Sequence, residues 1–477
     1  MNRKTNILIL YIFSSILLVS GNGISKTVKE VKRSITLETF IRAACVHDRQ
    51  FQLILIDELS LKYKKALELP SKDLVLSATG QYNLKLAGDV AGGPEGIISL
   101  SKLFPFTGTE TSASYSISPA RSGSGYTSSF TTIVSQPLAR NAFGRNTRLH
   151  DRILGLESRV SRYQIIEAYE DYLATIIGLY YQWYADTALY EASRRAWEEN
   201  RRLLGNLQLR LKNRIAHPID VNRVHLQTII SRDEMDTRRL QFEASRDLVY
   251  HAINYKGTKV LKPVFENFTA SLGKNFAADY QNQWAGNRTA MILDLLVQGG
   301  KLEGIRAADD LLPSVNLLAG YSIGSTAFGL NSSYSEHQVY GGLQFAFPFG
   351  RQKEKAALEV TRIEQRKNLI NKTNTKERLR NDLKTLHRRI RQEEGFITTA
   401  GSRFELARRI AVEEARLYRQ ARSPLKNLIE ARTALEENRL NLINHRVQLS
   451  TLRLEWLRLT DQLVKGKNLD ATRKNIR

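Results

Sequence analysis

Cysteine, proline and long apolar runs are all scarce in this chain. Among 477 residues there are one cysteine, Cys45, and 10 prolines. A lone cysteine excludes an intrachain disulfide framework and thiolate zinc sites, and its amphipathic surroundings favour a buried thiol. Beyond the N-terminal run described below, no stretch approaches eighteen apolar residues, so we expect no helical membrane span in the rest of the chain. If this protein enters a membrane, it must do so with β-strands.

Catalytic and nucleotide-binding motifs are missing too. The eight histidines form no HExxH pair, and the sequence has no phosphate-binding loop. The glycines of residues 92–96 and 122–126 are interpreted as loop glycines rather than dinucleotide fingerprints. His217 beside Asp220 fits an exposed turn histidine better than a metal or proton site. We therefore expect no enzyme activity, no cofactor and no metal site, and an enzyme such as a secreted hydrolase finds no support.

The N-terminus has the layout of an export signal. Arg3 and Lys4 precede an apolar run from Ile7 to Val19, and small and polar residues follow as far as Gly23. This order predicts a secretory signal peptide at residues 1–23. The alternative is a single N-terminal anchor.

The chain is strongly basic, with 71 Lys and Arg residues against 48 Asp and Glu and a net charge of +23. The charge becomes about +21 if Arg3 and Lys4 leave with the signal. The basic residues are interleaved with Glu along helical segments, which is typical of solvated helix faces. An exported chain also meets little nucleic acid, so we expect no nucleic-acid partner.

Two long proline-free runs dominate the chain. One extends from Arg145 to about Asn213, and the other follows Gly350 for about seventy residues, which at about 1.5 Å per residue gives helices about 100 Å long. Each run is preceded by a strand-like segment that ends in a proline. The predicted strand-to-helix junctions are marked by Pro137, Gly144, Pro348 and Gly350.

The turns after these runs repeat as the junctions do. Pro218 and Pro424 are about 206 residues apart, and the junction prolines about 211, which indicates an internal duplication. Asp220 is expected to cap the helix after the first turn. After Pro424, apolar residues recur every seventh position and predict a helix-packing seam: Leu428, Leu435, Leu442, Leu449 and Trp456.

Four strands are expected in each chain. Residues 74–86, the segment ending at Pro137, 312–323 and 339–347 alternate apolar and polar side chains, a weak signature of a membrane barrel that a soluble sheet would share. Residues 97–104 and 111–118 are also strand-like. For this inserted region we favour a loop or an ancillary hairpin, and two added barrel strands are the alternative.

Four strands cannot close on themselves, because about eight form the smallest packed barrel. In lipid, an open sheet would leave its edge groups unpaired at a cost of several kcal/mol each. Several copies are therefore expected to share one barrel, with the long helical hairpins packed in a ring beneath it. The predicted fold class is an α+β membrane protein with a two-fold internal repeat.

Several segments resemble one known family. Residues Gln136–Arg145 (QPLARNAFGR) closely resemble the strand-to-helix junction of TolC-type outer-membrane efflux proteins, the outer membrane factor family. Residues Leu312–Ser322, Phe347–Gln352 and Ser34–Ala44 resemble its third-strand entry, second junction and opening helix. The resemblance follows the family order over nearly the whole mature chain.

The resemblance implies a homotrimer with a 12-stranded barrel in the outer membrane and a helical barrel through the periplasm. It would be the exit duct for an inner-membrane transporter and a periplasmic adaptor, in efflux or type I secretion. Asp220 matches the acid usual after the first turn, whereas Lys426 departs from the pattern. Neither turn has the family's usual glycine, and Arg214 and Gln420 stand near its place. The implied periplasmic tip and adaptor contact is formed by Ala216, His217, Pro218, Ile219, Asp220, Arg422, Ser423, Pro424, Leu425 and Lys426.

The same resemblance divides the chain into eight segments. They are the signal peptide at 1–23, an N-terminal periplasmic or equatorial helix at 24–70, a first barrel hairpin with a long insertion at 71–137, a first long helical hairpin at 138–256, an equatorial segment and helix at 257–311, a second barrel hairpin at 312–348, a second long helical hairpin at 349–464 and a basic tail at 465–477.

Two further expectations concern function. The basic composition suggests a basic lumen or tip that would bias a duct toward anionic cargo, and drugs, metals and proteins are all compatible cargoes. The alternative to a duct is an exported coiled-coil assembly or adhesin without a pore.

Overall fold

The computed structural model describes residues 34–464 except 71, 85–91, 121–124, 258–259, 268–275, 277–279, 281–283, 285 and 326–335. The predicted signal peptide and basic tail lie outside these residues. The chain divides into two compact units. The first is Met1–Glu58, Arg162–Ala290 and Thr375–Arg477, and the second is Leu59–Ser161 and Met291–Asn374.

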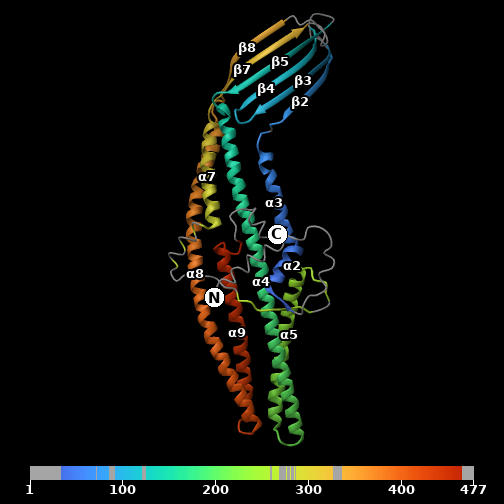
Figure 1. Cartoon of the computed structure of the whole chain (residues 1–477), viewed down its shortest axis with the longest axis vertical. Helices are drawn as coiled ribbons and strands as arrows, with labels where there is room; N and C mark the ends of the chain where they lie inside the picture. The colour runs from blue at the N-terminus through green and yellow to red at the C-terminus, as the bar shows by residue number, and fades with distance from the viewer. Residues whose placement is uncertain are drawn as a thin grey trace. The chain divides into compact units, whose positions relative to one another are not determined.

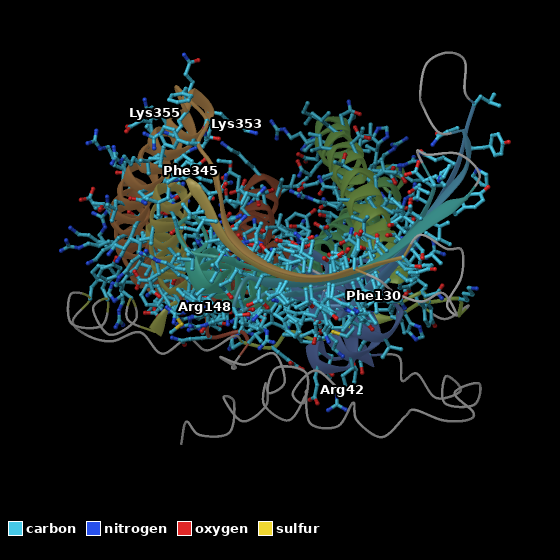
Figure 2. All side chains as sticks on the ribbon, turned by 90° about the horizontal axis from the view of Figure 1, so that it is seen from above. Arg42, Phe130, Arg148, Phe345, Lys353 and Lys355 are labelled. Carbon is cyan, nitrogen blue, oxygen red and sulfur yellow. The ribbon has the colours of Figure 1, made fainter. Side chains whose placement is uncertain are left out.

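The second unit contains one antiparallel sheet of six strands (Figure 1). Its strands are β2 (Leu74–Asn83), β3 (Gly93–Phe104), β4 (Thr109–Pro119), β5 (Tyr126–Pro137), β7 (Ser314–Ser325) and β8 (Glu336–Ala346). They lie in the order β2-β3-β4-β5-β7-β8, so β2 and β8 form the two edges. The sheet is bent rather than flat, as the strands that carry Phe130 and Phe345 show in Figure 2.

The expectation of four strands is wrong, because the inserted region adds β3 and β4 to the same sheet. β3 pairs with β2 from Lys102 to Gly93, and β4 pairs with β5 from Glu110 to Pro119. The glycines expected in a loop at 92–96 partly open β3 instead. A hairpin inside a sheet and a hairpin beside it have the same alternation, so the sequence alone does not separate them.

The long helices are those expected after the junctions. The helices α4 (Arg145–Lys212) and α8 (Gln352–Arg419) have 68 residues each, and α5 (Pro218–Ala252) and α9 (Leu425–Leu459) have 35 each. These equal lengths are the ones an internal duplication would produce.

Positive φ angles repeat between the two halves of the chain, as the helix lengths do. Residues that are not glycine adopt a positive φ just after each long helix and each return helix, in pairs 207 residues apart. The pairs are Arg214 and Ala421, and Asn254 and Asp461. The left-handed conformation costs such residues about 1–2 kcal/mol, so its recurrence at matching positions reflects the geometry of the connections.

The described chain opens with β1 (Ser34–Ile35), α2 (Leu37–His47) and α3 (Arg49–Glu68). Thr36 caps α2 as expected, and its side chain accepts a hydrogen bond from the Thr39 backbone N–H. Cys45 is buried, as predicted, and burial, together with the nearby Asp48 carboxylate, raises the pKa of its thiol to about 12. The thiol therefore stays protonated and unreactive at neutral pH.

Tyr180, a buried residue of α4, holds the first described strand of the chain in place. β1 pairs in parallel with β6 (Lys262–Pro263). The Tyr180 hydroxyl lies 2.9 Å from the Ile35 carbonyl oxygen and 2.7 Å from that of Val264. The hydroxyl also accepts from the Val264 N–H at 2.9 Å, so this α4 side chain contacts the backbone of β1 and of the residue directly after β6.

A buried charge cluster lies where α7 (Arg288–Asp309) begins. Within the first unit, the guanidinium of Arg288 forms an ion pair with Glu170 and lies 3.2 Å from Asp461 Oδ1. The Leu463 N–H donates to Glu170 Oε1 at 2.8 Å. The cluster thereby ties the chain after α9 to α4.

Candidate functional site

The strand register sorts the side chains of the sheet onto two faces. Residues directly opposite each other share a face, and side chains alternate along each strand. One face is mostly apolar and includes Leu74, Leu76, Ala78, Ile98, Leu100, Ala113, Tyr115, Phe130, Val134, Leu317, Tyr321, Ile323, Val339, Leu343 and Phe345.

The opposite face is mostly lined by hydroxyl and amide groups, although Val75, Ile97, Leu103, Ile133 and Leu318 also lie on it. It includes Ser77, Thr79, Ser99, Ser101, Ser112, Ser114, Ser116, Ser118, Thr127, Ser129, Thr131, Ser135, Asn316, Ser322, Gln338 and Gln344. Hydroxyl pairs bridge neighbouring strands at Ser77–Ser99 (2.6 Å), Ser116–Ser129 (2.7 Å), Ser118–Thr127 (3.0 Å) and Thr131–Ser322 (3.2 Å). Such a surface favours contact with water.

The charged side chains on this hydroxyl face are acidic. At the described strand positions they are Glu95, Glu110 and Glu336, and none is Lys or Arg. The amides of Gln81 and Asn83 donate to Glu95 at 2.6 and 2.9 Å. The described part of this face therefore carries no basic lining, whereas the predicted tip turns carry exposed Arg422 and Lys426.

Among the described residues, side chains of the apolar face are exposed on both edge strands. On the edge strands, Leu76 is 68% exposed, Val339 is 81% exposed and Leu343 is 68% exposed. A water-soluble monomer seldom exposes a continuous apolar surface of this kind, which marks a contact with lipid or with another protein.

The first strand-to-helix junction packs tightly at Gly144. Gly144 has φ of +72°, and a Cβ there would lie 2.4 Å from the Phe106 carbonyl oxygen and 2.8 Å from the Gly108 nitrogen. Arg148 donates to the same carbonyl of Phe106 at 2.6 Å. The turn between β3 and β4 is thus held against the start of α4. Pro137, the other predicted marker of this junction, is the last residue of β5.

The second strand-to-helix junction lacks the close packing of the first at its glycine. Gly350 has φ of +92°, but a Cβ there would meet no atom within 4 Å. Pro348 lies just beyond β8, and Arg351 donates to the Leu311 carbonyl at 2.6 Å. The two junctions share a backbone conformation but differ in packing.

The first predicted tip turn joins α4 to α5. The Ile215 N–H bonds to the Arg210 carbonyl at 2.8 Å, and Arg214 adopts the left-handed conformation. His217, not Asp220, occupies the N-cap, and Pro218 begins α5 instead of only breaking a helix. Proline suits the first helical position because its missing N–H needs no partner there.

The second turn has the same form. Ala421 is left-handed, and the Arg422 N–H bonds to the Leu417 carbonyl at 2.9 Å. Pro424 is the N-cap of α9, and the Ser423 hydroxyl donates to Glu414 at 2.6 Å.

A shared apolar cluster brings the two predicted tip turns together. Its buried members are Leu203, Leu207, Val224, Leu425 and Leu428, and Ala216 packs against them. Leu425, a predicted partner contact, is only 6% exposed and so joins the two turns within the chain. Ile219 is 55% exposed, and the side chains of His217, Pro218, Arg422, Pro424 and Lys426 are exposed as well.

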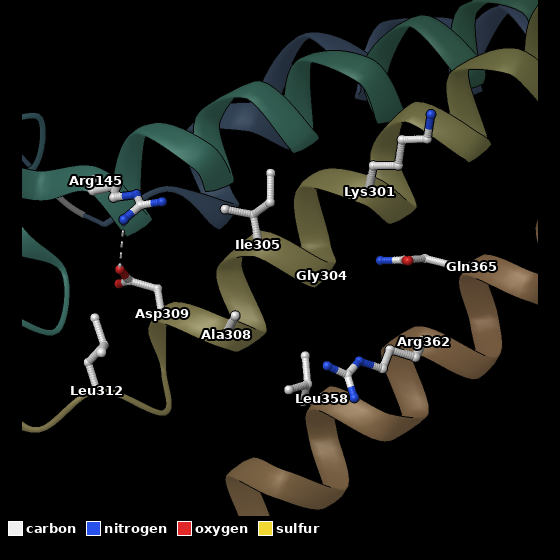
Figure 3. Close-up of a pocket in the computed structure, with 10 residues that line it drawn as sticks. All are labelled: Arg145, Lys301, Gly304, Ile305, Ala308, Asp309, Leu312, Leu358, Arg362 and Gln365. Carbon is white, nitrogen blue, oxygen red and sulfur yellow. Dashed lines mark ion pairs between the residues drawn. The ribbon is translucent and has the colours of Figure 1, made fainter.

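A hollow of about 460 Å³ lies between α7 and α8 in the second unit (Figure 3). Lys301, Arg362 and Gln365 line it, and Arg145 forms an ion pair with Asp309 at 3.9 Å beside it. Gln365 donates to the Gly300 carbonyl at 2.7 Å. The hollow is a gap beside the contact between α7 and α8. Its one acidic lining residue, Asp309, is already paired with Arg145.

Two other kinds of feature are absent from the described residues. No group of three or more His, Cys, Asp or Glu side chains in the described part of the chain is arranged to hold a metal ion. Among the same residues, no helix combines the length and apolar character needed to cross a membrane.

The sequence matches no protein-family model, and no curated protein matches it. Solved structures do match. The CmeC outer membrane channel of Campylobacter jejuni aligns with a TM-score of 0.68 at 11% identity, over 98% of this chain and 99% of that one.

Two further channels align nearly as fully. The outer membrane protein VceC of Vibrio cholerae has a TM-score of 0.67 at 10% identity, over 88% of this chain and 95% of its own. The open state of the MtrE outer membrane channel of Neisseria gonorrhoeae has 0.63 at 12%, over 90% of both chains. Over most of its length, this chain therefore has the fold of these outer-membrane channel proteins.

Proposed function

We propose that three copies of this chain form a channel in the outer membrane that extends into the periplasm. The channel would be the exit duct of a tripartite efflux or type I secretion system. It would receive cargo from an inner-membrane transporter through a periplasmic adaptor.

One observation carries this proposal: a bent sheet with one apolar and one hydroxyl-lined face. The apolar face suits lipid and the other suits a water-filled lumen. In the described residues, β2 and β8 have a strand neighbour on one side only. Because unpaired backbone groups are costly in lipid, these edges require strands from other copies.

The strand directions allow copies to join edge to edge. With an even number of antiparallel strands, β2 and β8 run in opposite directions. Strand β8 of one copy can then pair antiparallel with β2 of the next, and a ring of copies closes without a mismatch. The long helices, which need neighbours of their own, would continue the ring.

The exposed turns supply the surface for the adaptor. His217, Ile219 and Lys426 are exposed around a buried apolar cluster that fixes the two turns against each other. A rigid platform with exposed side chains suits docking, because little flexibility is lost on binding.

The channel is tested by purifying the full chain from outer-membrane fractions and recording current across planar lipid bilayers. We expect discrete, long-lived conductance steps. A water-soluble monomer without conductance would contradict the channel and favour a non-pore coiled-coil or adhesin-like assembly.

The adaptor contact is tested by photo-crosslinking in cells. A photoreactive residue at Ile219 should capture a periplasmic protein, whereas one at Leu240, which is 64% exposed elsewhere on α5, should not. Equal capture at both positions would contradict a specific contact at the turns.

A further inference from the structure

We infer that every copy contributes six wall strands to the barrel, so that three copies close an eighteen-stranded rather than a twelve-stranded pore. This inference rests on the proposed channel and concerns its width. It assigns a role to β3 and β4, which the resemblance to known efflux proteins does not account for.

The first support is that β3 and β4 are continuous with the sheet. They lie between β2 and β5, which would otherwise be neighbours. Ladders extend over the length of both strands, and one row of directly opposed residues crosses four strands: Ser77, Ser99, Ser114 and Thr131. An ancillary hairpin outside the wall would not interrupt the pairing of β2 with β5.

The second support is that both faces continue through the added strands. Ile98, Leu100 and Tyr115 lie on the apolar face, and Ser99 and Ser116 lie on the hydroxyl face. A hairpin placed in the lumen or in the periplasm would have no need of a lipid-compatible face. The alternation is the one that a wall strand requires.

The third support is a set of contacts that hold the turn between β3 and β4 against the end of β5 and the start of α4. The Gln136 side chain donates to the Thr107 carbonyl at 2.9 Å and accepts from the Thr109 hydroxyl at 2.6 Å. A Cβ on Gly108 would lie 3.0 Å from the Gly144 nitrogen. The turn of the added hairpin is therefore built into the strand-to-helix junction.

Strand number sets the width of the pore. With strands about 4.8 Å apart and tilted by about 40°, twelve strands give a backbone diameter of about 24 Å and eighteen give about 36 Å. Allowing about 5 Å for the side-chain layer on each wall, the open cross-section grows about threefold. The outer end of this duct would therefore admit a bulkier hydrophilic cargo than a twelve-stranded barrel.

The test is electron cryo-microscopy of the full-length assembly in lipid nanodiscs. Six strands per copy and a barrel about 36 Å wide are expected for a trimer. Four wall strands per copy, with the added hairpin outside the wall, would overturn this inference and leave the channel intact. An assembly without a barrel would overturn the proposed function itself.

Disulfide trapping gives an independent readout in the same assembly, with Cys45 replaced by alanine. Cysteine pairs at Ser77 and Ser99, and at Ser114 and Thr131, should form disulfides because each pair is directly opposed. The matched control pair at Ser77 and Thr131 should not, since three strand spacings of about 14 Å separate its members. A disulfide in the control pair alone would show β2 beside β5 and contradict the inference.

Discussion

Gly144 is the residue on which the first strand-to-helix junction most depends. Gly144→Ala would place a methyl group against the Phe106 carbonyl and force a side chain into a positive φ. We expect a clear loss of thermal stability and of assembled channel. Gly350→Ala is the matched control, because it has the same φ problem without a clash.

The measurement for this pair is the melting temperature of each purified variant, together with its yield in the membrane fraction. The Gly144 variant should lose substantially more than the Gly350 variant. Equal losses would mean that backbone conformation alone matters, and that the packing of the β3–β4 turn on the junction does not.

Glu167 offers a pH-dependent test beside the buried charge cluster. Burial raises the pKa of its carboxyl, although Thr289 donates to it at 3.0 Å. Because the folded state holds this proton more tightly, the stabilising contribution is present below the unfolded pKa of about 4.3 and is lost as pH rises through the raised folded value. Glu167→Gln keeps an acceptor for Thr289 and removes the charge.

We therefore expect Glu167→Gln to melt at a higher temperature than the parent protein at pH 7, with the difference shrinking toward pH 4. Thermal unfolding across this range checks the prediction. A variant that is less stable than the parent at pH 7 would show that the charge of Glu167 stabilises the helical unit.

At the scale of elements, the strand-to-helix plan follows from local signals. Prolines at the junctions, the absence of proline over long runs and heptad spacing predicted the long helices, and the seam residues Leu428, Leu442, Leu449 and Trp456 are buried. The fold class was predictable from the sequence because these signals are strong and extend over many residues. The number of strands in the sheet was not predictable, because residues 97–104 and 111–118 have strand-like alternation whether they join the sheet or form a separate hairpin.

The candidate site was predictable only in part. Period-two alternation placed residues on the correct faces of β2, but the acidic character of the hydroxyl face depends on pairing between distant strands. Likewise, the burial of Leu425 results from contacts with Leu203 and Leu207, more than two hundred residues earlier. Neither feature can be read from neighbouring residues along the chain.

The hydroxyl face should favour cations if it lines the pore. Replacing Glu95, Glu110 and Glu336 together by glutamine removes the acidic side chains described there, so we expect the cation-to-anion permeability ratio to fall. Reversal potentials in planar bilayers under a KCl gradient measure this ratio. Lys102→Gln, a charge change on the apolar face, is the matched control and should leave the ratio nearly unchanged. A larger shift from the Lys102 control would place the apolar face in the pore.

At the scale of the whole molecule, the central claim is that the two open edges of the sheet are closed by other copies of the chain. Nothing else in the described residues pairs with the outer sides of β2 and β8, and lipid cannot satisfy their backbone groups. Closed rings are the assemblies that satisfy both edges of every copy at once.

The most direct measurement is oxidative cross-linking between these edges, with Cys45 replaced by alanine. Single cysteines are placed along β2, at Ser77 or Thr79, and combined with single cysteines along β8, at Gln338 or Gly342. For at least one combination, we predict covalent dimers and trimers in membranes and no larger species. Monomers alone in every combination, or an open ladder beyond three copies, would contradict the closed trimeric channel.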